Sequence, residues 1–465
     1  MTSDSPGIPG APGATRGTPR NAAVLIAVVW VTLAFAYGLF FSFSVFFVPL
    51  IAEFRWSRGL TAGAMSVSAI VQGLCAPLAG VVADRFGPRP VMVGGVVMLA
   101  AASMLASTIQ APWQLYLYTG VLGALGLVAV GWVPTGLLLS RWFHARRGRM
   151  AGIAFSGMGF GVFMIGPVTQ WLIAISTWRT ASFVLGLTAL VLLLPLALWG
   201  IRDPAATTTG ARVVGNERAS QDEVDAAGGG PGTVEPRRAS AVSSERGSTV
   251  PGPPATRRPD ATVADALRMR AFWALFAAYF FTPLAVFPVA THAVAFTVDH
   301  GYPAMWAATA FGTMGLMSTV GRVAFGFAAD RFGGPPTATL SYACTAGGTA
   351  ALLALELVPG AAWLVVFAAL FGLGFGARGP IITAMASEWF GGRRFGVIYG
   401  ILNLGNGVAG AIGPWFGGFV HDVTGSYRVA FLAAIAFSAC GAGCFWLARG
   451  RQDEGRRAVL SGRDE

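Results

Sequence analysis

The chain has 465 residues, of which 54% are hydrophobic and only 11% are charged, and its mean hydropathy is +0.62. A soluble domain carries about 25% charged residues, so this composition excludes an ordinary soluble protein and indicates a membrane protein. The net charge of +11 comes from arginine, because the sequence contains no lysine. The arginines lie mainly between hydrophobic segments and are not clustered in one soluble domain, which argues against nucleic-acid binding.

Hydrophobic segments long enough to cross a bilayer follow one another in two sets of six. The first set predicts helices near residues 22–50, 57–83, 90–110, 113–139, 149–173 and 180–200. A stretch rich in Gly, Pro, Ser, Thr and Arg then runs from about 202 to 264, and its composition predicts disorder. The second set predicts helices near residues 270–298, 303–328, 337–357, 361–387, 396–420 and 429–448. We therefore predict an all-α membrane protein with twelve transmembrane helices.

The arginines are concentrated in alternate connections, which sets the expected orientation. The connection after the fourth segment carries four of them, whereas the connections on the opposite side carry only Arg55, Arg58, Arg179 and Arg428. Both termini and the long central loop are therefore expected in the cytoplasm, with the chain in the inner (plasma) membrane. The expected parts are a disordered tail (1–21), an N-terminal six-helix bundle (22–200), a disordered loop (201–265), a C-terminal six-helix bundle (266–449) and a tail (450–465).

The two halves of the sequence repeat one another. "ADRFG" at 83–87 recurs at 329–333, "SRWFHARR" at 140–147 recurs as "SEWFGGRR" at 387–394, and "IGP" at 165–167 recurs at 412–414. The separation stays near 247 residues through the series, which indicates a duplication. The sequence thus predicts two pseudo-symmetric bundles of six helices.

The loop "GVVADRFGPRP" at 80–90 resembles the signature between helices two and three of the major facilitator superfamily, and "GFAADRFGG" from Gly326 is its second copy. This resemblance implies the two-bundle transporter fold. Charged residues of the two loops are expected to lie at cytoplasmic helix ends and to act as a latch between conformations: Asp84, Arg85, Arg89, Asp330 and Arg331.

Three further runs resemble the monocarboxylate transporter and oxalate/formate antiporter branch of that superfamily. They are "FFVPLIAEFRWSR" at 46–58, "RWFHARRGRMAGIAFSGMGFG" at 141–161 and "GPWFGGFVHDVTGSYRVAF" at 413–431. The resemblance implies transport of small organic anions, and it matches Arg322 to the helix-eight arginine that holds a substrate carboxylate in that branch.

Two arginines lie deep in predicted spans, where a charge is costly and usually serves a function. Arg322 precedes Asp330 by eight residues, and Arg378 precedes Phe390 by twelve, so both are expected about 12–18 Å from the cytoplasmic helix ends. A guanidinium matches the bidentate geometry of a carboxylate. Both are candidate substrate-binding residues, and hydrogen bonds to backbone carbonyls are the alternative role for each.

Polar and aromatic residues elsewhere in the spans complete the predicted substrate site, namely Tyr37, Tyr118, Tyr399 and Asn403, with Gln72, Trp132 and Gln170 as further candidates. The proton-coupled members of the branch carry an aspartate one turn before the helix-eight arginine, and here that position is Ser318. His292 is the titratable candidate for a proton site, with a packing role as the alternative.

We accordingly predict a secondary transporter of small organic anions, of the monocarboxylate kind, that works by alternating access with a coupling proton or counter-anion. Export of apolar or drug-like solutes, with both arginines structural, is the alternative, and a membrane sensor that binds without translocation is a third reading. The sequence contains no catalytic constellation, no metal-ligand spacing and no phosphate-binding loop, so neither an enzyme nor a cofactor is expected.

Overall fold

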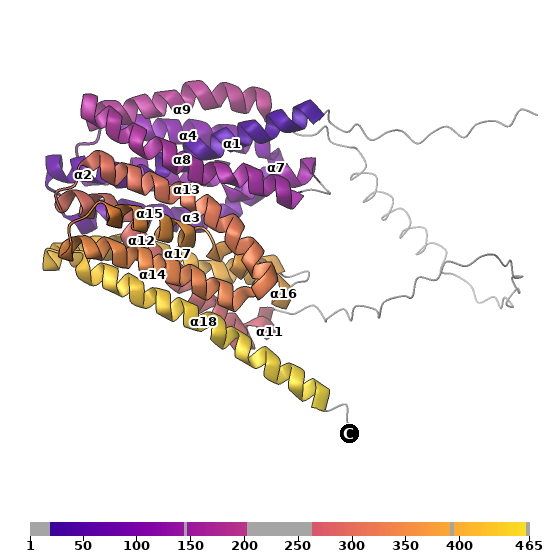
Figure 1. Cartoon of the computed structure of the whole chain (residues 1–465). Coiled ribbons are helices and arrows are strands. Elements are labelled where there is room, and N and C mark those ends of the chain that lie inside the picture. The colour runs from indigo at the N-terminus through magenta and orange to yellow at the C-terminus, as the bar shows by residue number, and fades with distance from the viewer. Residues whose placement is uncertain (1–18, 144–146, 202–262, 391–394, 462–465) are drawn as a thin grey trace, which may run out of the picture. The chain divides into compact units, whose positions relative to one another are not determined.

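The computed structural model describes residues 19–143, 147–201, 263–390 and 395–461, and throughout these ranges the chain is helical apart from short connections. The predicted disordered loop lies almost wholly outside the described residues, as do residues 1–18 of the predicted N-terminal tail. The helices of the two halves belong to one compact unit. Figure 1 colours the N-terminal half from indigo to magenta and the C-terminal half from pink to yellow.

The N-terminal half forms six spans, some of which consist of several helical pieces. Its helices are α1 (Pro19–Phe41), α2 (Phe43–Phe54), α3 (Arg58–Phe86), α4 (Pro88–Ala106), α5 (Pro112–Leu115), the π-helix η1 (Tyr116–Gly123), α6 (Ala124–Val130), α7 (Trp132–Trp142), α8 (Arg147–Ile175) and α9 (Trp178–Gly200). Span one joins α1 and α2, and span four joins the pieces from α5 to α7.

The C-terminal half repeats this plan. Its helices are α11 (Val263–Arg268), α12 (Arg270–Asp299), α13 (Ala304–Phe332), α14 (Gly334–Leu357), α15 (Ala362–Phe375), α16 (Arg378–Phe390), α17 (Phe395–Thr424) and α18 (Arg428–Ser461). Span ten joins α15 and α16. The short helix α11 begins inside the predicted loop, and α18 continues through most of the predicted C-terminal tail.

Eleven helical segments of the described chain are long and apolar enough to cross a membrane. α13 is the twelfth long helix, and it carries Arg322, Asp330 and Arg331, which lower its hydropathy. The prediction of twelve spans in two bundles is confirmed, with most predicted bounds within a few residues of the helices. We call the face that carries the start of α1 and the loops after α3 and α13 the tail face, and the opposite face the far face (Figure 1).

Spans four and ten are interrupted at equivalent positions. Gly131 has an extended backbone (φ −73°, ψ −150°) and separates α6 from α7. Gly376 and Ala377 separate α15 from α16. At the repeat separation of 247 residues, Gly131 corresponds to Arg378, the first residue of α16. Both breaks therefore occur deep in a span, where free backbone groups are tolerated only next to protein or water.

The two halves meet through α3 against α17 and through α8 against α13. Glycines make the second contact close, because Gly159, Gly312 and Gly315 face the backbone of the opposite helix. A Cβ on Gly312 would lie 2.8 Å from the carbonyl oxygen of Phe163, for example. Small residues at such crossings let membrane helices approach closely without a hydrophobic driving force.

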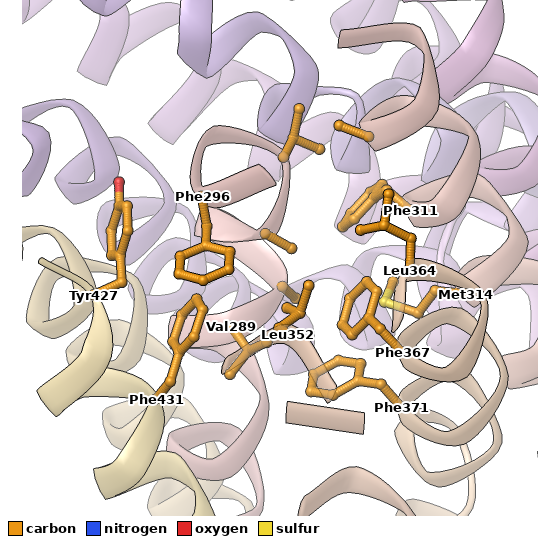
Figure 2. Close-up of a cluster of buried hydrophobic side chains, with 14 of the residues drawn as sticks. Val289, Phe296, Phe311, Met314, Leu352, Leu364, Phe367, Phe371, Tyr427 and Phe431 are labelled. Atoms are coloured by element: carbon orange, nitrogen blue, oxygen red, sulfur yellow. The ribbon is translucent and has the colours of Figure 1, made fainter. Parts of the chain in front are cut away.

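An aromatic cluster fills the far-face half of the C-terminal bundle. Figure 2 shows Phe296 beside Phe431 and, further along, Phe367 beside Phe371. The Phe296 and Phe431 ring centroids are 5.1 Å apart, and those of Phe367 and Phe371 are 5.2 Å apart. Contacts of this kind contribute about 0.5–1.5 kcal/mol beyond the area they bury, so this part of the bundle is firmly packed.

Candidate functional site

Arg322 lies at the junction of the two halves. It is ten residues from the end of α13, which places it about 15 Å inside the span. Its Nη1 donates to the carbonyl oxygen of Phe155 on α8 at 3.3 Å. A Cβ on Gly376, in the break of span ten, would lie 3.1 Å from the Arg322 Nε. Glycine at this position therefore leaves room for the arginine side chain. No acidic residue of the described chain forms an ion pair with Arg322.

An aromatic group from the N-terminal half faces this guanidinium. The Arg322 Cζ lies 5.7 Å from the centroid of the Trp132 ring. Trp132 packs on Phe155, with centroids 4.2 Å apart, and Tyr37 of α1 contributes its hydroxyl to the same group. The Trp132 side chain is nevertheless 50% exposed. Arg322 therefore has a partly open aromatic surface beside it and donors that no carboxylate of the described chain occupies.

Local sequence explains this geometry. Gly131 ends α6, so Trp132 becomes the first residue of α7 and leaves the helical path of the preceding segment. A Cβ at Gly131 would lie 3.6 Å from the Tyr37 hydroxyl. Ser318, one turn before Arg322, turns its hydroxyl back to the carbonyl of Gly315 at 2.6 Å, so no titratable group takes the place of the branch aspartate.

Arg378 lies inside the C-terminal half and is 1% exposed. Its Nη2 donates to the Thr345 hydroxyl at 3.0 Å and to the Gly374 carbonyl at 3.1 Å, and its Cζ lies 4.4 Å from the Tyr342 ring centroid. Its Nε and Nη1 atoms have no hydrogen-bond partner among the described residues. These contacts are with α14 and α15, so the side chain points away from the α8 interface at which Arg322 lies.

The remaining predicted substrate residues do not join the Arg322 group. Tyr399 shares hydrogen bonds with Tyr279 (2.9 Å) and Thr383 (2.7 Å) inside the C-terminal half. Asn403, on α17, is exposed. Tyr118 belongs to the π-helix and packs against an apolar cluster near the far face of the N-terminal half. Of the predicted residues, Tyr37, Trp132 and Arg322 are the three that the structure brings together.

His292, the predicted proton site, is fully buried between the halves. One ring nitrogen lies 2.9 Å from the carbonyl oxygen of Pro414, and Nδ1 has no partner in the described structure. Its ring makes an edge contact with Phe47 of α2 and lies 4.9 Å from the Tyr427 ring. The residue is thus on the far-face side of the molecule, apart from the Arg322 group.

The predicted latch residues lie at the tail face, but the contacts that the structure describes for them stay within one half. Asp84 is 4.0 Å from Arg141 of α7, and Arg89 donates to the Leu198 carbonyl at 2.6 Å. Arg85 and Arg331 lie against the neighbouring rings of Phe86 and Phe332. In the described part of the chain, Asp330 forms no ion pair.

Phe155 and Gly376 are the parts of this site that the sequence analysis missed. The signal for Phe155 was weak, since one Phe among 33 carries no mark of its own. The signal for Gly376 was present in the "GLGFGARG" run at 372–379, where a cluster of glycines precedes a charged residue within an apolar span.

Comparison with known proteins supports one family. Residues 29–377 and 350–464 match the Major Facilitator Superfamily. Monocarboxylate transporter 13 of Rattus norvegicus is 28% identical over 88% of this chain and 85% of its own length. Monocarboxylate transporter 4 of Mus musculus is 28% identical over 89% of this chain and 79% of its own length.

Solved structures show the same fold. A bacterial homologue of the human lysosomal transporter Spinster, solved in an inward-facing and unoccupied conformation, gives a TM-score of 0.64 at 15% identity over 93% of this chain and 98% of the other. The nucleoside transporter NupG gives 0.64 at 12% identity over 91% of this chain and all of the other.

The expectations of a multi-pass membrane transporter, not an enzyme, and of similarity to the monocarboxylate branch are confirmed by these comparisons. Repeated bundles, broken spans and a partly buried arginine at their junction agree with them. The chain belongs to the Major Facilitator Superfamily, and within it resembles the monocarboxylate transporters.

Proposed function

We propose that the chain is a secondary transporter of small organic anions, of the monocarboxylate class, in which Arg322 holds the carboxylate. The observation that carries the proposal is the Arg322 guanidinium at the junction of the halves, which has no acidic partner among the described residues and donates a 3.3 Å hydrogen bond to a backbone carbonyl. A guanidinium binds a carboxylate with two parallel charge-assisted hydrogen bonds. The related monocarboxylate transporters agree with this class.

The body of the solute would lie against Trp132, with Phe155 behind the indole and Tyr37 beside it. The proposed site is therefore cationic on the C-terminal half and aromatic on the N-terminal half. Arg378, Tyr399, Asn403 and Tyr118 would act at a distance, through the packing of their own bundles. Alternating access would move the two halves about this junction, in the plasma membrane with both termini in the cytoplasm, driven by a proton or a counter-anion.

The test is the thermal stability of the purified protein against a panel of solutes. A ligand that binds only the folded state stabilises it by about 2.7 kcal/mol at a hundredfold excess over its dissociation constant. We expect lactate, pyruvate or a related acid to raise the unfolding midpoint of the wild type and to leave Arg322→Gln unchanged. A rise with neutral apolar compounds alone, equal in both proteins, would establish the exporter in place of the anion transporter.

Replacing Trp132 should change which acids the protein prefers. In Trp132→Ala, we expect affinity for an acid with a phenyl or branched alkyl body to fall about tenfold more than affinity for acetate, because an aromatic contact and its buried area are lost. The measurement is competition against a labelled acid. Trp113→Ala is the control, since Trp113 is 61% exposed on α5 near the far face. Equal losses for all acids would remove Trp132 from the site.

A further inference from the structure

Arg58, the first residue of α3, joins the two halves at the far face. Its guanidinium donates to both carboxylate oxygens of Asp299, at the end of α12, with distances of 2.5 and 3.1 Å. Its Nη1 also donates to the hydroxyl of Tyr427 at 2.7 Å, and its Cζ lies 5.2 Å from the Tyr427 ring centroid. One N-terminal side chain thus holds two residues of the C-terminal half.

A second carboxylate of the C-terminal half binds the beginning of the same helix. Asp422, near the end of α17, accepts hydrogen bonds from the backbone N–H groups of Arg58 (2.8 Å) and Gly59 (2.7 Å). These N–H groups have no partner within their own helix, and a negative charge at a helix N-terminus is favourable. Asp422 therefore caps α3 from across the interface.

The backbones of α3 and α17 touch beside these charges. A Cβ on Gly418 would lie 2.5 Å from the carbonyl carbon of Arg58, and a Cβ on Gly59 would lie 3.1 Å from the backbone nitrogen of Phe419. Tyr427 is 2% exposed and borders the aromatic cluster of the C-terminal half (Figure 2). Burial raises the pKa of the Tyr427 hydroxyl, so it remains a neutral acceptor for Arg58. The charged contact is thus anchored in packed structure on both sides.

The N-terminal half contains a matched pair that does not cross the interface. Glu53, near the end of α2, binds Arg179 at the start of α9, also at the far face. The nearest N–O distance is 2.5 Å in both pairs, and the carboxylates are similarly exposed, at 41% for Glu53 and 37% for Asp299, whereas Arg179 is 35% exposed and Arg58 is 17% exposed. The Glu53–Arg179 pair stays within one half, whereas the Arg58–Asp299 pair joins the two halves.

We propose that Arg58, Asp299, Asp422 and Tyr427 form a far-face lock, which closes this face of the transporter and must open before the far side gains access to Arg322. Among the described residues one charged pair lies at the tail face, Asp84 with Arg141, and it stays within one half. The lock residues were not among the predicted latch residues. The inference rests on the alternating access of the proposed function, but not on its substrate.

The experiment measures distances between spin labels on the full-length protein. The four cysteines, Cys75, Cys344, Cys440 and Cys444, are first replaced by serine. One label pair reports on the far face (Thr108 and Val358) and another on the tail face (Ser140 and Ser387), each with one label in each half. Asp299→Asn and Asp422→Asn weaken the lock, and Glu53→Gln is the matched control.

We expect both lock variants to increase the share of molecules with a long far-face distance and a short tail-face distance. The ratio of these molecules to those with a closed far face should rise about tenfold, which corresponds to about 1.4 kcal/mol. Glu53→Gln should match the wild type. Gly418→Ala offers a second route without a change of charge, because its methyl group would wedge α3 from α17; Gly443→Ala, where nothing lies within 4 Å of the added Cβ, is its control.

Distance distributions that remain those of the wild type in Asp299→Asn, Asp422→Asn and Gly418→Ala would overturn the lock, as would an equal shift in Glu53→Gln. If one of these three variants misfolds, the distances measured in the other two test the proposal. Failure of the proposed function is a separate result, because it appears as the absence of an anion-dependent thermal shift in the wild type.

Discussion

Gly161→Ala is expected to lower the unfolding midpoint strongly, because a methyl group at this position would force α1 away from α8. The added Cβ would lie 2.7 Å from the Cα of Ala34 and closer still to its carbonyl group. These are backbone atoms, which cannot turn aside as a side chain can. Overpacking costs about 1–3 kcal/mol and at times more, and the gain of about 1 kcal/mol from alanine in a helix offsets only part of it.

The same crossing contains two further glycines that meet backbone. A Cβ on Gly157 would lie 2.5 Å from the Trp30 carbonyl oxygen, and a Cβ on Gly38 would lie 2.7 Å from the Gly161 carbonyl oxygen. α1 and α8 therefore touch over about two helical turns, and a displacement at Gly161 disturbs all of this contact. We expect a net loss of about 2 kcal/mol or more.

Gly152→Ala is the matched control for this prediction. Gly152 lies on the same helix, and an added Cβ would meet nothing within 4 Å. Its midpoint should equal that of the wild type or exceed it slightly. Both variants are compared in one detergent at one heating rate, since unfolding of such proteins is often irreversible. Equal midpoints for the two variants would show that the α1–α8 contact is looser than the structure has it.

Arg322→Gln should reduce uptake of organic anions about a hundredfold or more. Each hydrogen bond to a charged group contributes about 1.5–3 kcal/mol, and a guanidinium makes two of them to one carboxylate. The change also removes the bond to the Phe155 carbonyl, so the thermal midpoint of each variant must be measured alongside its uptake. A loss of uptake with a retained midpoint assigns the effect to binding.

Arg322→Lys separates charge from geometry. It would be the only lysine in the chain, and it keeps the positive charge but loses the planar fork that fits both carboxylate oxygens. We expect uptake between that of the wild type and Arg322→Gln, with the loss mainly in apparent affinity. Unchanged anion uptake in Arg322→Gln would exclude this residue as the carboxylate anchor. In that case the structural role, through Phe155, would be the one that remains.

The sequence predicted the spans well because the bilayer sets a minimum length for each apolar segment. It also predicted how far Arg322 lies from the end of its helix, because that distance depends only on the number of residues along the helix. The direction of a side chain was harder to predict. Arg378 begins a new helix after the break at Gly376, so its orientation does not follow from the preceding span. Tyr118 lies in the π-helix of span four, whose wider turns alter the helical phase.

The far-face contacts could not be predicted from the sequence. Arg58 meets residues 241 and 364 positions away in the chain, and no local pattern links them. The distribution of arginines predicted only that Arg58 lies in a connection on the side of the membrane with few arginines. Charge on such connections informs topology, whereas the pairing partner depends on how the two bundles meet.

The internal repeat relates the two contacts between the halves to one another. In the repeat α3 corresponds to α13 and α8 corresponds to α17, so the α3–α17 contact is the counterpart of the α8–α13 contact. A homodimer of a single six-helix unit would carry such an interface twice, with identical residues in both copies. In the fused chain the copies are free to differ. Counting the separation between the repeats, Arg58 corresponds to Ala304 and Asp422 to Ile175, so one interface has charges where its twin is apolar. Within one chain the two related interfaces can therefore carry different residues, which a symmetric homodimer does not permit.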